Sequence, residues 1–341
     1  MADADTTEQS IRADAPRPAV VVAAFAIVYV VWGSTYLAIR FAVESLPPFA
    51  MAGARFLFAG AVLLLWARLR GQELPTTRGE WRTAAIAGVL LLFGGNGSLV
   101  WAEQRIASGI AALLVATLPV WMVLLDWWRP GGVRPRAGVF AGLALGIGGL
   151  ALLVGPGLAP SGEAGAGVDL AAAGVLVLGS ISWAAGSVYL RHVPRAASAT
   201  ASNGMQMLAG GVALGLVGLA SGELRGFDTA AVTSRSALSL LYLAVFGSIV
   251  AFSAYTYILR VSTPARVATY AYVNPVVAMF LGWAFASEPV TPRTLAAAAV
   301  ILAGVATITL TGESARAAEP QRSGAGPRHP GTDAEPRAAD T

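Results

Sequence analysis

The chain has 341 residues, of which 56% are hydrophobic and only 12% charged, with a formal net charge of +4. Soluble globular proteins carry about 25% charged residues, so this composition indicates an integral membrane protein and excludes an ordinary soluble domain. There is no cysteine, and the two histidines lie in polar segments, which excludes disulfides and thiolate metal sites and gives no basis for a histidine metal centre or a cofactor site.

Apolar runs follow one another along almost the whole chain. Residues 1–18 are polar and contain two prolines, which predicts a disordered tail before the first run. Most runs reach the roughly 20 residues that a helix needs to span a bilayer. They cover residues 20–39, 55–67, 83–102, 106–125, 137–162, 170–190, 196–222, 236–259, 267–287 and 294–312. The predicted fold is therefore an all-α integral membrane protein with ten transmembrane helices, followed by a second disordered tail at 313–341.

A degraded repeat relates the two halves of the chain. The stretch 93–119 returns at 246–275, with a Phe-Gly pair, an arginine in a short turn and a proline inside the following helix. Trp32 and Trp183 correspond in the same way. Residues 19–156, with five helices, therefore repeat as residues 168–312. Because five is odd, the second copy enters the membrane from the opposite side, so the repeats are inverted, as in many transporters.

The arginines predict the orientation. They gather in segments on the same side as the N-terminus, such as 68–82 and 129–136. The positive-inside rule then puts both termini in the cytoplasm, with the chain crossing the inner membrane many times. The isoelectric point near 9.7 reflects the arginines of these loops and the base composition of the genome, so no nucleic-acid partner is predicted.

Three stretches resemble a known family. They are residues 30–60 with the sequence VVWGSTYLAIRFAVESLPPFAMAGARFLFAG, the LPV of 118–120 and the NPV of 274–276. On these stretches the chain resembles the ten-helix, EamA-type branch of the drug/metabolite transporter superfamily over residues 19–310. The resemblance implies an inner-membrane carrier, usually an exporter of amino acids or other small metabolites. Members often carry Glu-Pro where this chain has Leu118-Pro119 and Asn274-Pro275, which removes two intramembrane carboxylates.

The first helix carries a mixed aromatic and basic face. Trp32, Tyr36 and Arg40 are spaced four residues apart and therefore share one side of the helix. Two aromatic rings beside a guanidinium can hold an organic anion or the carboxylate of a zwitterion. In the alternative interpretation Trp32 packs against neighbouring helices and Arg40 extends to the outer interface.

Two helix-interior prolines predict where a cavity lies. Pro119 and Pro275 each remove a backbone hydrogen bond, and membranes tolerate such breaks where they face protein or water. Tyr270 and Asn274 lie one turn apart beside Pro275, and Trp121 follows Pro119. A purely structural kink is the alternative. The predicted cavity residues are Trp32, Tyr36, Asn96, Pro119, Trp121, Trp183, Tyr270 and Asn274.

Three charged residues at or within the membrane are candidates for a functional role, namely Arg40, Arg55 and Glu103. Arg55 lies deep in the second helix, where a charge needs a partner; either Glu44 or Glu103 pairs with it, or it contacts substrate. Glu103 is the best candidate for proton coupling. Alternatively it is a water-exposed helix end that pairs with Arg105.

The sequence favours secondary transport of a small polar or amphipathic metabolite by alternating access, with export as the expected direction. Its expected partners are that small molecule and the lipid bilayer. A membrane-embedded enzyme, or a receptor or scaffold without transport, is the alternative. No lysine is present, so there is no nucleotide-binding loop. Because the acidic residues between 20 and 312 lie near helix ends, we expect transport driven by the substrate's own gradient.

Small residues recur at a spacing of four in the fifth and tenth helices. The pairs are Gly142 with Gly146 and Ala299 with Ala303. Such pairs predict close helix packing, either between helices of one chain or across a homodimer.

Overall fold

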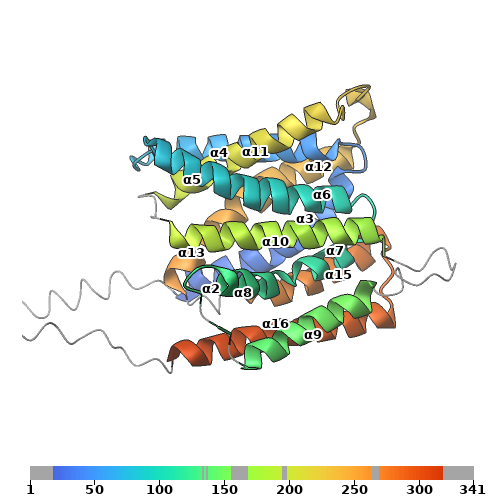
Figure 1. The fold of residues 1–341 in the computed structure, drawn as a ribbon. Helices are drawn as coiled ribbons and strands as arrows, with labels where there is room; N and C mark the ends of the chain where they lie inside the picture. Colours follow the sequence, from blue (N-terminus) through green and yellow to red (C-terminus); the bar gives the residue numbers. More distant parts are fainter. Residues whose placement is uncertain are drawn as a thin grey trace, which may run out of the picture.

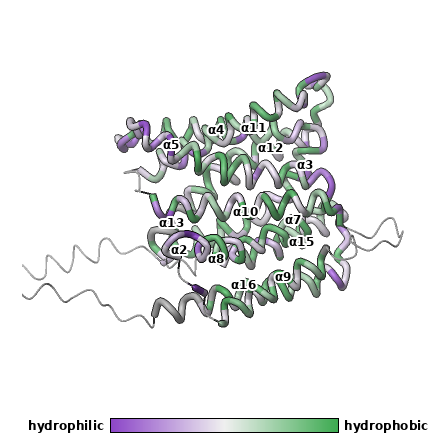
Figure 2. Tube along the Cα trace, in the orientation of Figure 1, coloured by the Kyte–Doolittle hydropathy of each residue, from purple (hydrophilic) through white to green (hydrophobic). Residues whose placement is uncertain are grey.

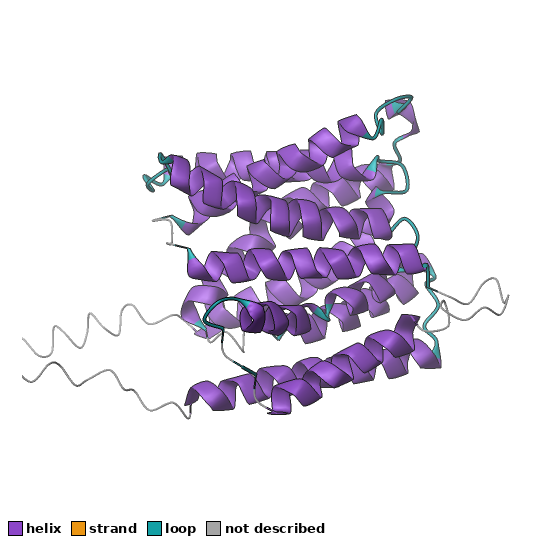
Figure 3. Cartoon of the chain, viewed as in Figure 1, coloured by secondary structure: helices purple, strands orange, loops and turns teal. Residues whose placement is uncertain are grey.

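The computed structural model describes residues 18–132, 134–135, 137–154, 168–193, 198–262 and 269–317. All regular structure in these ranges is helical (Figure 3). The first half contains α2 Pro18–Ile27, η1 Val28–Trp32, α3 Gly33–Ala42, α4 Pro48–Leu69, α5 Arg78–Gly88, η2 Val89–Asn96, α6 Gly97–Ala102, α7 Ser108–Val115, α8 Leu118–Trp128 and α9 Ala137–Val154. The second contains α10 Leu170–His192, α11 Ala199–Ala220, η4 Thr229–Ala231, α12 Ser234–Tyr242, η5 Leu243–Val250, α13 Ala251–Val261, α15 Tyr270–Ala286 and α16 Pro292–Ala317.

These elements join into membrane-length segments. Seven are long and apolar enough to cross a bilayer, and three shorter apolar helices lie at 137–153, 273–286 and 292–308. Polar residues gather at the two ends of the bundle, while the helix middles are apolar (Figure 2). The segments coincide with the ten predicted runs, so the predicted all-α, ten-helix fold is confirmed.

Capping residues explain where several helices begin. Thr77 and Glu80 form a capping box at the start of α5: Thr77 Oγ1 accepts from Glu80 N at 3.2 Å, and Glu80 Oε2 accepts from Thr77 N at 3.0 Å. Asp169 Oδ1 accepts from two amides in the first turn of α10. Both caps lie in polar connections between apolar runs, so these helices start where the chain enters the apolar layer again.

Corresponding helices of the two halves pack against each other. α4 lies along α11 and α9 lies along α16, the latter pair forming the lower edge of the bundle in Figure 1. The contact of α4 with α11 is close enough to require glycine, because a Cβ on Gly60 would lie 2.7 Å from the main-chain oxygen of Gly204. α2 and α10, which begin the two halves, start at opposite ends of the bundle (Figure 1), as inverted repeats require.

The contact of α9 with α16 partly corrects the prediction about small residues. A Cβ on Gly142 would lie 2.7 Å from Gly304 O, and one on Gly304 would lie 2.6 Å from Gly146 N. The predicted pair on α9 therefore packs within one chain. The predicted pair on α16 does not pack within this chain, because Ala299 and Ala303 are exposed; packing of this pair across a homodimer stays a prediction. Gly304, one position further along the helix, supplies the small residue instead.

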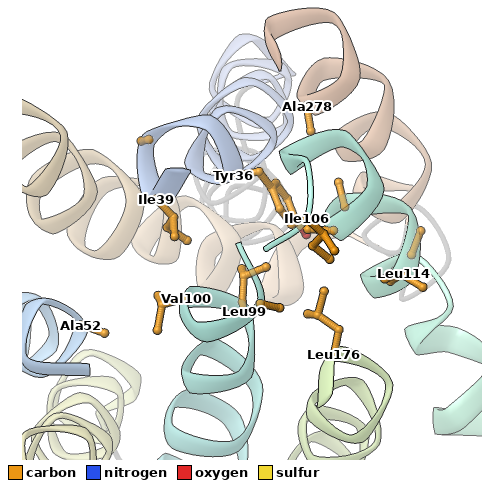
Figure 4. Packing of buried hydrophobic residues seen from close by; sticks show 14 of the residues in the cluster. Tyr36, Ile39, Ala52, Leu99, Val100, Ile106, Leu114, Leu176 and Ala278 are labelled. Carbon is orange, nitrogen blue, oxygen red and sulfur yellow. The ribbon is translucent and has the colours of Figure 1, made fainter. Parts of the chain in front are cut away.

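The largest buried cluster extends through much of the bundle and includes the residues where α6 turns into α7. In Figure 4 the ring of Tyr36 on α3 extends toward Ile106, with Leu99 of α6 and Leu176 of α10 below it. Ala278 of α15 closes the same cluster from the other half. Residues of both halves therefore pack densely against one another near this turn.

Candidate functional site

A cavity lies between the two halves of the bundle. It holds about 980 Å³ of empty space, counting its open mouth. Its wall comes from η1, α3, α4, η2, α6, α7 and α8 of the first half and from α10, α11, η5, α13 and α15 of the second. Both repeats therefore contribute to one cavity.

The structure brings most of the predicted cavity residues to this wall. Those on the wall are Trp32, Tyr36, Asn96, Trp183, Tyr270 and Asn274. Two predicted cavity residues, Trp121 and Pro119, do not lie on the wall. Trp121 Nε1 donates to Thr117 Oγ1, one turn earlier, at 3.1 Å. Pro119 lies in the first turn of α8. Of the three charged candidates only Arg55 lies on the wall, whereas Arg40 and Glu103 do not.

The break predicted at Pro119 is real, and its position explains the correction. α7 ends at Val115 and α8 begins at Leu118, and both residues lie on the cavity wall. Thr117 Oγ1 donates to Leu114 O at 2.6 Å across the break. Pro119 follows as an early residue of a new helix, where a missing amide hydrogen costs nothing. The broken backbone therefore faces the cavity, while the Pro119 ring does not.

Three π-helical segments contribute to the cavity wall, and none of them was predicted. Trp32 ends η1, Asn96 ends η2, and Gly247 and Ser248 lie in η5; all four residues are on the wall. A π turn leaves carbonyl groups available for other partners and is frequent at functional sites. Gly247 O indeed accepts from Trp32 Nε1 at 3.2 Å. The only sequence signal was the Phe-Gly pair that recurs within η2 and η5.

An aromatic cluster covers one side of the cavity. The ring centroid of Trp32 lies 4.9 Å from that of Tyr255 and 5.3 Å from that of Tyr270. Phe252 joins at 6.3 Å and also lies on the wall. With its amide oriented to satisfy its neighbours, Asn274 donates to Tyr270 O at 3.2 Å. α13 thus adds two aromatic residues that were not predicted, although they lie one turn apart.

Arg55 also lies on the cavity wall, next to Gly247 and Ser248 of η5, and has only 5% of its surface exposed. Its Nε donates to Ser248 Oγ at 2.8 Å, and its Cζ lies 4.7 Å from the ring centroid of Phe56. Neither predicted acidic partner binds it. Glu44 pairs with Arg235 at an exposed helix end, and the carboxylate of Glu103 has no hydrogen-bond partner. The expectation of a structural ion pair is therefore wrong for the part of the chain that the structure describes.

Glu103 differs from both sequence interpretations. It ends the segment that contains α6, is completely buried, and neither carboxylate oxygen has a hydrogen-bond partner. Burial raises the pKa of Glu103 well above its usual value, nearby Glu288 raises it further, and Arg40 opposes them. The expected exposed end paired with Arg105 is wrong, because Arg105 stacks on Trp101 instead. Glu103 is thus a buried carboxyl with a raised pKa, and it does not belong to the cavity wall.

Two acidic residues of the second half cap helices of the first half. Glu288 Oε1 accepts from Ser108 N at 2.8 Å, and its Oε2 accepts from Gly109 N at 3.2 Å, at the start of α7. Glu223 Oε2 accepts from the amides of Phe49 and Ala50 at 3.1 and 3.0 Å, at the start of α4. These carboxylates complement the positive ends of the helices and tie the halves together at one end.

Comparisons with known proteins agree with this architecture. The profile of the EamA-like transporter family matches the chain twice, at residues 19–155 and 170–310. The two matches reproduce the internal repeat. Together they cover most of the chain.

Individual relatives cover nearly the full length. The uncharacterized inner membrane transporter YedA of Escherichia coli (strain K12) is 41% identical over 284 residues, which cover 83% of this chain and 88% of YedA. The uncharacterized transporter YvbV of Bacillus subtilis (strain 168) is 25% identical and covers 86% and 92% of the two chains.

A solved crystal structure shares the fold. It has a TM-score of 0.59 and 20% identity, and the alignment covers 87% of this chain and 100% of the other. The ten-helix arrangement, the double match and the identity to YedA lead to one conclusion: the chain is a multi-pass membrane protein that belongs to the EamA-like transporter family.

Proposed function

We propose that this protein is a secondary transporter that moves a small polar or amphipathic metabolite, such as an amino acid or a related compound, across the inner membrane by alternating access. The observation that carries the proposal is the cavity whose wall is shared by both inverted repeats. A site between inverted repeats is exposed to one side or the other when the repeats exchange conformations.

Helix irregularities around the cavity support movement at this site. The break between α7 and α8 and the π segments η1, η2 and η5 all contribute wall residues. Irregular backbone in a membrane is tolerated where it lines a cavity, and such positions can absorb changes in backbone angles. Near the α6–α7 turn, residues of both halves pack densely around Tyr36 (Figure 4), which supports a state that is closed at that end.

The direction and driving force belong to the same proposal. Export and a cytoplasmic position of both termini are supported by the family resemblance and by the arginine distribution. The described wall contains no aspartate or glutamate, which supports transport driven by the substrate's own gradient. A pH gradient imposed on proteoliposomes then leaves an electroneutral substrate unconcentrated. Accumulation that Glu103→Gln abolishes would make Glu103 a coupling group and overturn this part.

Counterflow tests transport itself. Proteoliposomes are loaded with single members of a metabolite panel, and uptake of the same labelled compound is followed. We expect saturable counterflow for at least one member, and a large loss in Trp183→Ala, which removes a ring from the wall. Trp81→Ala, at an exposed position on α5, is the matched control and retains counterflow.

The alternative functions predict different results in this assay. A receptor or scaffold binds a panel member, seen as a higher melting temperature, without counterflow of that compound. A membrane-embedded enzyme converts the compound to a product that chromatography resolves. Either result, with no counterflow across the panel, contradicts the proposed transport.

A further inference from the structure

One basic side chain on the cavity wall has unused hydrogen-bonding capacity. Arg55 donates through Nε to Ser248 Oγ, but its Nη1 has no hydrogen-bond partner in the part of the chain that the structure describes. The described wall contains no acidic residue, and none of the ion pairs formed by described residues includes Arg55. A buried charge without a partner raises the free energy of the folded protein. An anionic ligand in the cavity would pair with Arg55 and remove this penalty.

The neighbours of Arg55 fix the direction of its guanidinium group. Ser248 Oγ donates to Leu243 O at 3.1 Å, five residues back in the π segment η5, so its lone pairs accept from Arg55 Nε. Gly247 leaves room for the other side of the group, because a Cβ at that position would lie 3.2 Å from Arg55 Nη2. A planar guanidinium held in one orientation is well suited to a carboxylate.

A second unpartnered polar atom lies on the same wall. Ser180 on α10 is 4% exposed, and its Oγ has no hydrogen-bond partner among the described residues. Arg55 belongs to the first repeat and Ser180 to the second, so both halves offer a donor to a ligand. The repeat adds no second arginine to the cavity. The position in the second half that corresponds to Arg55 is Gln206, whose side-chain amide donates to Ser202 Oγ.

The remainder of the wall suits an apolar body rather than a second charge. Trp32, Trp183 and Phe252 present aromatic rings. A free ammonium group would find no carboxylate on the described wall, although aromatic faces attract cations weakly, by about 0.5–2 kcal/mol. A single negative charge on the ligand is therefore enough to neutralise the charge of Arg55.

We propose that the cavity binds organic monocarboxylates that have an aromatic or bulky apolar body and no free ammonium group, with Arg55 as the anchor of the carboxylate. The proposal rests on the proposed transport function and narrows its substrate class. It favours 2-oxo, aryl-alkanoic or N-acylated acids over the zwitterionic amino acids that the family resemblance suggests.

A matched set of probes tests the charge preference on the purified full-length chain. Quenching of tryptophan fluorescence, reported by Trp32 and Trp183, is titrated with 3-phenylpropionate, 3-phenylpropan-1-ol, phenethylamine and phenylalanine. A charge-assisted hydrogen bond predicts that the acid binds at least about tenfold more tightly than the alcohol. Phenethylamine and phenylalanine are expected to bind more weakly than the acid. An alcohol, amine or zwitterion that binds as tightly as the acid overturns the proposal.

Variants assign the effect to Arg55. In Arg55→Gln the affinity ratio of acid to alcohol is expected to fall to about 1 because the charge is lost. Ser180→Ala should lower acid binding by a smaller factor. Arg105→Gln, on an exposed turn, should keep the wild-type ratio. A preserved ratio in a folded Arg55→Gln protein contradicts the assignment, and if that variant does not fold, the wild-type probe series decides alone.

Failure of this inference is distinct from failure of the proposed transport. Counterflow of phenylalanine or phenethylamine, with no preference for the acid, supports transport and overturns the carboxylate proposal. Selective binding of 3-phenylpropionate that disappears in Arg55→Gln, without counterflow of any compound, supports the carboxylate site and overturns transport.

Discussion

Two ionisable residues, Arg55 on the cavity wall and Glu103 away from it, are buried in different settings. Arg55 keeps a charged group at the wall with a free donor, whereas Glu103 is packed with no partner for either oxygen. A carboxyl in that setting is stable only in its neutral form. Glutamine has nearly the same shape as a protonated glutamate, so it should replace Glu103 without loss of packing.

This leads to a pH-dependent prediction for Glu103→Gln. The pKa of Glu103 is raised in the folded protein. The protonated carboxyl therefore contributes its full stabilisation of the fold below the pKa of the unfolded chain, about 4.3. This stabilisation declines as the pH rises toward the pKa of the folded protein. The wild type should therefore lose stability from this group as the pH rises above about 4.3, by at most about 1.4 kcal/mol per pH unit. Glu103→Gln should lack this slope and match or exceed the wild type at pH 7.

The measurement is the unfolding free energy or melting temperature in one detergent at pH 5, 6 and 7. Glu73→Gln, at an exposed position near the start of α5, serves as the control and should follow the wild-type curve. Parallel curves for wild type and Glu103→Gln, or a variant that is less stable at every pH, would show that Glu103 is charged and paired in the folded protein.

At the scale of elements, α4 depends on a cap from the other half of the chain. Pro47 precedes the helix and offers no side-chain cap, so Glu223 satisfies the first amides instead. Glu223→Ala removes this acceptor and a favourable interaction with the helix dipole, which should cost about 1–2 kcal/mol. The melting temperature should fall, with a smaller fall for Glu223→Gln, which keeps one acceptor oxygen.

The control for this prediction is Glu73→Ala, which removes a carboxylate from an exposed turn. An equal melting temperature for Glu223→Ala and Glu73→Ala would mean that water caps α4 as well as the carboxylate does. Because Glu223 reaches α4 from beyond α11, the same variant should also increase hydrogen exchange at Phe49 and Ala50 specifically.

The elements also show what the sequence could and could not predict. Runs of apolar residues defined the ten helices because a bilayer requires spans of fixed length. The π segments were missed because their sequences stay apolar and contain no strong helix breaker except glycine. Pro119 correctly marked a break, but the direction of its ring and of Trp121 depends on the rotation of α8, which periodicity in an all-apolar helix does not define.

The sequence predicted which residues lie on the cavity wall better than it predicted the hydrogen-bond and ion-pair partners of the charged residues. Arg55 and the aromatic residues Trp32 and Tyr36 were recognised because polar or aromatic groups stand out in apolar helices. The pairing of Arg55 with an acid was wrong, since Glu44 pairs with Arg235 and the Glu103 carboxyl is buried without a hydrogen-bond partner. Ser180 carried no signal, because an isolated serine in a membrane helix usually bonds to its own backbone.

At the scale of the whole molecule, the inverted repeats and the arginine distribution predict a single orientation. The absence of cysteine in the natural chain allows single cysteines to report it. Thr76→Cys and Ser221→Cys replace exposed residues at opposite ends of the bundle. We expect an impermeant thiol reagent to label Thr76→Cys only from the cytoplasmic side and Ser221→Cys only from the opposite side. The reverse pattern would overturn the predicted orientation, and labelling of both from one side would contradict the fold.

Alternating access requires that one cavity is exposed to the two sides of the membrane in turn. Ala116→Cys tests this requirement, because Ala116 lies on the cavity wall at the break between α7 and α8 and is 3% exposed. An impermeant thiol reagent is applied to one side of the membrane at a time, with Thr76→Cys and Ser221→Cys as references for sidedness. Alternating access predicts that Ala116→Cys is labelled from each side, and labelling from one side only under all conditions would contradict it.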